Sequence, residues 1–152
     1  MRFFNIYRAV KLFISLSLSF ALLWTFTACA LHTDAQEDIF DIVEKNYDTI
    51  LKACEESDLD TLSAIKGITK AELVDGYVIV YCKGAGIAPS SQDYGFYYSP
   101  TNSPVAVDCN LDIVCNVDKL TPEENGYKYV ADGNTFYTQH IKGNFYFYSN
   151  AY

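Results

Sequence analysis

The sequence predicts an α+β domain in which an N-terminal helix, with a short second helix, packs on a twisted antiparallel sheet of six or seven strands. Apolar residues recur every three or four positions from Asp34 to Glu56, which indicates a helix with one apolar face. From Ile68 to the end of the chain the apolar period is close to two, and turn-forming dipeptides separate the segments. Helices followed by a run of strands are typical of the α+β class.

The first part of the chain has the pattern of an export signal. Arg2, Arg8 and Lys11 give it a basic start, and an apolar run from Leu12 to Phe26 follows. Small residues close the run, and this order is typical of a segment that directs export and does not belong to the folded domain. We therefore assign residues 1–28 to a signal peptide.

The junction Phe26-Thr27-Ala28-Cys29 resembles the lipobox of bacterial lipoproteins, in which cleavage before a cysteine is followed by attachment of a lipid. The resemblance implies that Cys29 carries the lipid and anchors the protein to the cell membrane through a tether over residues 29–34. Two alternatives stay open. Cleavage after Ala30 would release a secreted protein, and the uncleaved run over 12–28 approaches the length that spans a bilayer. All three place the domain outside the cytoplasm.

About 120 residues follow the leader, which is enough for one domain, and we place it at residues 35–152. Because the three leader charges are basic, this part keeps 8 Lys and Arg residues against 19 Asp and Glu residues, a formal charge of −11. So acidic a surface repels phosphate backbones, and nucleic acid is therefore not an expected partner.

The first element of the domain is a helix from about Asp34 to Glu56. Its apolar stripe consists of Phe40, Val43, Tyr47, Ile50, Leu51 and Cys54. Ser57-Asp58 interrupts the pattern, and a short second helix follows that ends at Gly67. Both helices are expected to serve packing.

The strands follow in the order of the chain. Asp75-Gly76 predicts a tight hairpin between Ile68–Val74 and Tyr77–Cys82, and a loop over Gly84–Ser91 is expected to interrupt the sheet. Further strands are predicted at Tyr94–Ser99, Val105–Val117 with a bend near Asn110, Tyr127–Ala131, Asn134–Ile141 and Phe145–Tyr148. We expect all of them to pair in meander order.

Four cysteines remain after Cys29, namely Cys54, Cys82, Cys109 and Cys115. In an exported protein they allow three disulfide pairings, or none. On one straight strand Cys109 and Cys115 would lie about 20 Å apart, beyond the reach of a disulfide. No C-x-x-C pattern occurs and His140 is the only histidine of the folded part, so no metal or other cofactor is predicted.

No catalytic residue is predicted. Asp108-x-Asn110-x-Asp112 has the spacing that opens a calcium-binding loop, but the glycine and glutamate positions of such a loop do not fit. His140 alternates with apolar and small residues on a strand, which is typical of a structural histidine. Ser90, Ser91 and Asp93 could join His140 in a hydrolase, which is the least favoured reading.

Aromatic residues crowd the C-terminal half of the chain. Phe145 and Phe147 alternate with Tyr146 and Tyr148, so both faces of the last strand carry an aromatic row. We expect the phenylalanines to face the helix. Tyr146 and Tyr148 on the other face are either covered by the loop over 84–91 or exposed, and an exposed pair would be a ligand-binding platform for a sugar or protein surface.

The segments GFYYSP and YT…FYFY resemble those of small exported proteins of Gram-positive bacteria, and this resemblance implies only the location. We predict a non-catalytic extracytoplasmic lipoprotein that binds a protein or a cell-wall glycan at the envelope. The alternative is an inhibitor or immunity-type protein whose acidic surface blocks a secreted basic enzyme or toxin. A small envelope hydrolase is the third and least favoured prediction.

Overall fold

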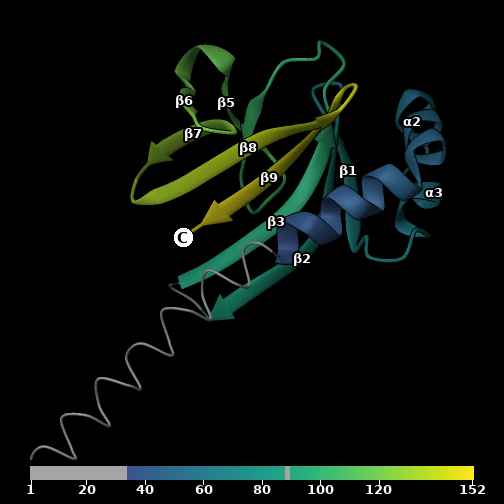
Figure 1. Cartoon of the computed structure of the whole chain (residues 1–152), viewed down its shortest axis with the longest axis horizontal. Helices are drawn as coiled ribbons and strands as arrows, with labels where there is room; N and C mark the ends of the chain where they lie inside the picture. The colour runs from purple at the N-terminus through teal and green to yellow at the C-terminus, as the bar shows by residue number, and fades with distance from the viewer. Residues whose placement is uncertain (1–33, 88–89) are drawn as a thin grey trace, which may run out of the picture. The chain divides into compact units, whose positions relative to one another are not determined.

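The computed structural model describes residues 34–87 and 90–152 (Figure 1). The predicted signal peptide, the lipidation site Cys29 and the alternative cleavage site at Ala30 lie outside the described residues. The chain divides into a unit over Met1–Asp34 and a compact unit over Ala35–Tyr152. The second unit contains three apolar clusters of its own, so it holds the packing that it needs to fold.

The predicted helix over 34–56 is confirmed, with a turn at Asn46 that separates residues 34–45 from α2 (Tyr47–Glu56). The Asn46 amide Nδ2 donates to the carbonyl of Ile42 at 2.8 Å and so competes with the backbone ladder at this point. α2 ends at Ser57, whose φ of 56° lies in the left-handed region. Within 34–87 and 90–152, no helix is both long and apolar enough to cross a membrane.

The short second helix is α3 (Leu59–Ser63). Asp58 begins it, because its Oδ1 accepts the backbone N–H of Thr61 at 3.0 Å and so satisfies a free donor of the first turn. Leu62 is fully buried against the helices and the sheet, which fixes α3 beside α2.

Seven strands form one antiparallel sheet in the order β1-β2-β3-β9-β8-β7-β6. They are β1 (Lys70–Val74), β2 (Tyr77–Ile87), β3 (Ser90–Tyr98), β6 (Thr121–Glu123), β7 (Gly126–Ala131), β8 (Asn134–Lys142) and β9 (Phe145–Ala151). The predicted meander order is wrong at one point, because β9 inserts between β3 and β8. Two meanders therefore meet at the β3–β9 pair, and the last strand of the chain is central.

The segment over Val105–Val117, predicted as a strand with a bend near Asn110, is a separate hairpin of β4 (Val105–Val107) and β5 (Ile113–Asn116). The Asp108 carboxylate Oδ1 accepts the backbone N–H groups of Asn110 and Asp112, both at 2.9 Å, and thereby closes a turn. The predicted interruption near Asn110 is confirmed, but the two halves are not one bent strand, because this local side-chain turn reverses the chain. A 3-10 helix (Val117–Lys119) follows the hairpin.

The loop predicted over Gly84–Ser91 does not interrupt the sheet. β2 continues to Ile87 and β3 begins at Ser90, so the two strands form one long hairpin. The pairing register of β2 with β3 shifts between Tyr81 and Lys83, so the hairpin contains an irregularity at this point. Residues 88–89 lie outside the described residues.

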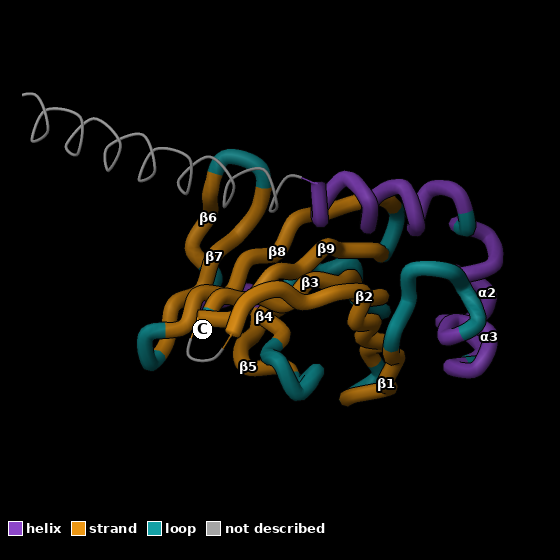
Figure 2. The backbone as a smooth tube through the Cα atoms, turned by 90° about the horizontal axis from the view of Figure 1, so that it is seen from below, coloured by secondary structure: helices purple, strands orange, loops and turns teal. Residues whose placement is uncertain are grey.

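The sheet lies between two layers (Figure 2), with the helices on one face and β4–β5 on the other. Phe145 and Phe147 face the helices, as predicted. Their rings lie 5.7 Å from the ring of Tyr47 and 6.2 Å from the ring of Phe40, respectively. On the opposite face Tyr97 of β3 and Tyr146 and Tyr148 of β9 pack beneath Val105, Val107 and Leu111. Both faces of the central strands are therefore covered.

Candidate functional site

The structure places Tyr146 and Tyr148 on the face away from the helix, as the alternation predicts, but buries both. Tyr146 is 6 % exposed and Tyr148 is 1 % exposed. The cover that the structure describes is the β4–β5 hairpin, which the sequence pattern did not predict. The Tyr146 ring stacks on Tyr97 with centroids 5.4 Å apart, and its hydroxyl donates to the carbonyl of Asn102 at 2.9 Å. The exposure that a ligand platform requires is therefore absent from this structure.

The residues considered for hydrolysis are not brought together. His140 lies opposite Tyr146 in the sheet and Asp93 lies opposite Asn150, so they are four residues apart along β9. That separation is about 13 Å along the strand direction. The exposed His140 ring is held by a contact of 2.7 Å between its Nε2 and the carbonyl oxygen of Gly143. These positions do not form a nucleophile–base pair.

The residues with calcium-loop spacing have a structural role. Asp108 holds the turn between β4 and β5 through the two backbone N–H groups described above, whereas Asn110 and Asp112 are exposed. In the part of the chain that the structure describes, no group of three or more His, Cys, Asp or Glu side chains gathers to hold a metal ion.

The four cysteines of the domain are free thiols. Cys54, Cys82 and Cys115 are buried, and Cys109 is exposed. Burial raises the pKa of Cys54 and of Cys82 to about 12. Since the thiolate is the reactive form, burial makes both of these thiols poor nucleophiles.

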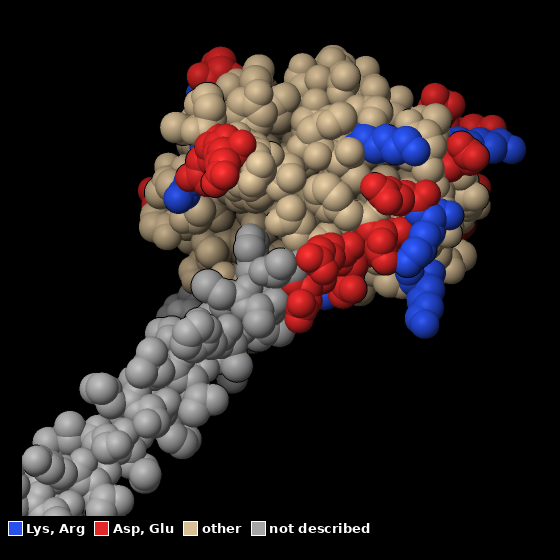
Figure 3. Space-filling model, in the orientation of Figure 1, with Lys and Arg blue, Asp and Glu red and all other residues tan. Residues whose placement is uncertain are grey.

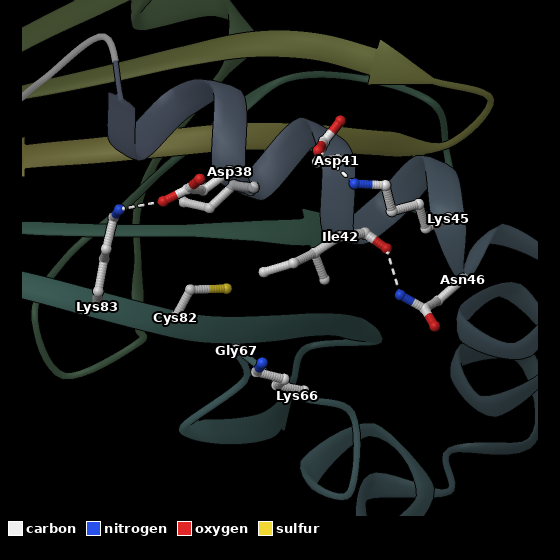
Figure 4. Close-up of a pocket in the computed structure, with 10 residues that line it drawn as sticks. Asp38, Asp41, Ile42, Lys45, Asn46, Lys66, Gly67, Cys82 and Lys83 are labelled. Atoms are coloured by element: carbon white, nitrogen blue, oxygen red, sulfur yellow. Dashed lines mark hydrogen bonds and ion pairs between the residues drawn. The ribbon is translucent and has the colours of Figure 1, made fainter.

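A groove of about 570 Å³ lies between the first helix and β2 (Figure 4). Its floor includes Ile39 and Cys82, which are both buried, and the side chain of Ile42. Its rim comes from three separate segments and carries both acidic and basic side chains. The helix supplies Asp38, Asp41, Lys45 and Asn46, the turn before β1 supplies Lys66 and Gly67, and β2 supplies Lys83. The groove thus combines an apolar floor with a rim of both charges.

Two ion pairs cross or border the groove. The Lys83 Nζ lies 2.8 Å from Asp38 Oδ2, and joins β2 to the helix. The Lys45 Nζ lies 2.5 Å from Asp41 Oδ2 one helical turn away, and this hydrogen bond raises the pKa of Lys45. All four side chains are at least 41 % exposed, so the pairs hold the rim only weakly. Lys66 is exposed and makes no ion pair with any residue that the structure describes.

Gly67 allows the turn before β1 to approach the helix. Its φ of 97° favours glycine, and a Cβ at this position would lie 2.6 Å from Ile42 Cδ1. The groove could not be predicted from the sequence because its residues come from positions 38 to 83 and follow no common pattern. The only local signal is Gly67, which by its position indicates the end of a helix.

Acidic side chains gather along the exposed face of the first helix (Figure 3), and include Glu37, Asp38, Asp41 and Glu44. Against this background, the groove rim carries three of the eight lysines that follow the leader. The groove is therefore less negative than the helix surface beside it.

Comparisons with known proteins give no relative for this chain. A scan against protein-family models and searches of curated proteins and of solved structures found no match.

Proposed function

We propose that the chain is a non-catalytic lipoprotein, held outside the cytoplasm by a lipid on Cys29, whose domain binds a partner at the cell envelope. The observation that carries this proposal is the order of the leader, in which a basic start and an apolar run end at Thr27-Ala28-Cys29. A single lipid-bearing cysteine directly before a folded domain suits a protein that acts at the membrane surface.

The groove between the first helix and β2 supports a binding role. A partner segment with apolar and charged side chains can place the former over Ile39 and Ile42 and the latter on the rim. Exposed ion pairs contribute little to folding stability, so Lys83 and Lys45 can exchange their partners for groups of a ligand at low cost. We assign this groove to a peptide segment of a protein partner.

The non-catalytic part of the proposal is supported by the roles of the reactive side chains. His140 is held by the Gly143 carbonyl, Asp108 closes a turn, and Cys54 and Cys82 are buried with raised pKa values. Each has a structural explanation that needs no substrate.

The acidic face of the first helix favours the second candidate function, an inhibitor or immunity-type protein that blocks a secreted basic enzyme or toxin. Complementary charge would speed association with such a partner and make binding sensitive to salt. Binding to a partner with a basic active-site rim would support this second function, whereas binding to a wall or membrane component would support the first.

Two double variants with the same net charge test the groove. Lys45→Glu with Lys83→Glu reverses two charges on the rim, whereas Lys52→Glu with Lys119→Glu reverses two exposed charges elsewhere. Binding of residues 30–152 to cell-wall fractions and to secreted proteins of the host should weaken at least about tenfold in the first variant only. Equal weakening in both variants would show that bulk charge governs binding, and would contradict the assignment of the groove.

A further inference from the structure

Four buried polar atoms gather at one end of the sheet face beneath the β4–β5 hairpin. They are the Tyr148 hydroxyl, both amide atoms of Asn150 and the Tyr152 hydroxyl, and none makes a hydrogen bond of normal geometry. The Tyr152 hydroxyl lies beside the side chains of Asn150 and Cys109. Tyr148 and Asn150 are each 1 % exposed. The three residues alternate along β9 and its end, so their side chains lie on the same face of the sheet.

Two other buried tyrosines of this layer have hydrogen-bonded hydroxyls. The Tyr97 hydroxyl lies 2.8 Å from Thr138 Oγ1 and accepts the N–H of Val105 at 2.9 Å. The Tyr146 hydroxyl donates to Asn102. Since more than about 90 % of buried polar groups in proteins are paired, four unpaired atoms at one place indicate a partner that the folded chain does not supply.

The neighbouring strands define the chemistry of this place. The register puts Asp93 opposite Asn150 and Gly95 opposite Tyr148, and Tyr81 lies beyond Gly95 on β2. Both the Tyr81 hydroxyl and an Asp93 carboxylate oxygen lie against Gly84, at 2.5 and 2.8 Å from the position of a Cβ there. Tyr81 and Asp93 are half-buried, so they lie at the more open end of the cluster.

This set of groups favours a neutral ligand rich in hydroxyl groups. Phenol and amide groups donate and accept hydrogen bonds, and the flat faces of tyrosine suit the apolar faces of a sugar ring. Asp93 accepts from hydroxyls but repels anions. Lys83 lies opposite Tyr94 in the β2–β3 register, and Tyr94 faces the helices. The Lys83 side chain therefore belongs to the helix side of the sheet and brings no positive charge to this site.

The cover of the site is strained at its tip. Leu111, in the turn between β4 and β5, has a φ of 65°, a conformation that a bulky residue rarely adopts. It is 2 % exposed and packs in the same cluster as Tyr148. Burial raises the pKa of Tyr152, and Cys109 of the same turn lies close enough to raise it further, whereas the Asn150 side chain lowers it. The turn therefore holds Leu111 in place against its backbone preference.

We propose that Tyr148, Asn150 and Tyr152, with Tyr81 and Asp93 at the open end, form a binding site for one ring of a neutral sugar. The turn over Asp108–Asp112 is the lid of this site and lifts to admit the sugar. This inference goes beyond the proposed function, because it uses a different surface from the groove and requires no lipid anchor.

The test compares variants that remove buried polar atoms without a hydrogen bond with a variant that removes a hydrogen-bonded tyrosine hydroxyl. Tyr148→Phe and Asn150→Leu remove unpaired polar atoms, so without ligand both variants should melt no lower than the wild-type domain over residues 30–152. Tyr97→Phe, the matched control, leaves Thr138 and the N–H of Val105 without a partner and should melt lower. The probes are glucose and N-acetylglucosamine, titrated into each protein while the melting temperature is measured.

Saturable rises of the melting temperature with one of these sugars are expected for the wild-type domain and for Tyr97→Phe. Tyr148→Phe and Asn150→Leu should need at least about tenfold more sugar, because each lacks a group that the ligand pairs with. In Leu111→Asn the new side chain tolerates a positive φ, and the apolar contact that holds the turn closed is lost. This variant should bind sugar more tightly because a larger fraction of the protein is open. It should also melt lower in the absence of sugar.

Three results would overturn the proposal: no rise with either sugar in the wild-type domain, an equal rise in Tyr148→Phe, or melting of Asn150→Leu far below wild type. Weaker sugar binding by Leu111→Asn would refute the lid. Because the groove variants leave these residues intact, sugar binding that persists in Lys45→Glu with Lys83→Glu would separate this site from the proposed function.

Discussion

Gly95 lies where β2, β3 and β9 pack most closely. A Cβ at this position would lie 2.0 Å from the carbonyl oxygen of Val80 and 2.7 Å from the ring of Tyr148. Gly95→Ala should therefore lower the free energy of unfolding by about 3 kcal/mol, because the clash involves backbone as well as a buried ring. Urea unfolding of the variant measures this loss.

Gly76→Ala is the control for Gly95→Ala. Gly76 has a φ of 84°, but nothing lies within 4 Å of an added Cβ. Only backbone strain is expected there, about 1 kcal/mol. Equal losses in the two variants would show that the close approach at Gly95 does not constrain the sheet.

Tyr146 and Tyr148 are expected to contribute mainly to packing of the free domain. Both are buried beneath β4–β5, so Tyr146→Ala and Tyr148→Ala should each cost about 3 kcal/mol or more, as truncation of a buried aromatic residue does. Thermal unfolding of the two variants is the measurement. An unchanged melting temperature in either variant would place that ring outside the core.

The buried thiols make the domain sensitive to alkali. Cys54 and Cys82 have a pKa of about 12 in the folded protein, against 9.0 for an ordinary cysteine. Below 9.0 both states hold the protons. Between 9.0 and about 12 only the unfolded chain loses them, so unfolding becomes more favourable as the pH rises. Each thiol should contribute a loss of up to about 1.4 kcal/mol per pH unit in that window.

Urea unfolding at about pH 8 and about pH 10.5 measures this effect, with the double variant Cys54→Ala and Cys82→Ala as the comparison. The variant should lose less stability than wild type between the two values. Cys109→Ala, at an exposed site, should lose as much as wild type. A loss in the double variant equal to that of wild type would contradict the role of the buried thiols.

At the scale of elements, β9 is the strand on which both layers depend. It pairs with β3 and β8, faces the helices through Phe145 and Phe147, and faces the hairpin through Tyr146 and Tyr148. Deletion of residues 143–152 should therefore unfold the domain. The near-ultraviolet circular dichroism spectrum should disappear in this variant.

The matched control for the deletion is the edge strand β6, whose three residues are exposed and pair only with β7. Replacement of these residues with glycine should leave the spectrum nearly unchanged. A folded deletion variant would show that β9 is peripheral, against its central place in the sheet.

The elements that the sequence predicted are those that local patterns determine. The helix over 34–56, the Asp75-Gly76 turn and strands β7 and β8 follow from periodicity and turn chemistry near in the sequence. The position of β9 beside β3 depends on pairing across about 50 residues of chain, for which alternation gives no signal. The β4–β5 hairpin escaped prediction because the turn made by Asp108 interrupts a pattern that otherwise continues through it.

At the scale of the whole molecule, the sequence predicted the charge and the aromatic faces but neither candidate site. The groove joins residues 38, 66 and 83 from three elements, and the cluster around Asn150 depends on which side chains lack partners after folding. Alternation correctly put Tyr146 and Tyr148 on the face away from the helix. It could not predict their cover, since that comes from a second sheet.

The proposed function depends on export and anchoring through Cys29, and metabolic labelling of the full chain tests this most directly. Cells expressing the wild-type chain or Cys29→Ala are grown with labelled palmitate, and cell and medium fractions are compared. We predict that the label enters the wild-type protein in the membrane fraction and is absent from Cys29→Ala, which should move to the medium if Ala30 serves as a cleavage site. Equal labelling of both chains, or none in either, would contradict the lipoprotein assignment.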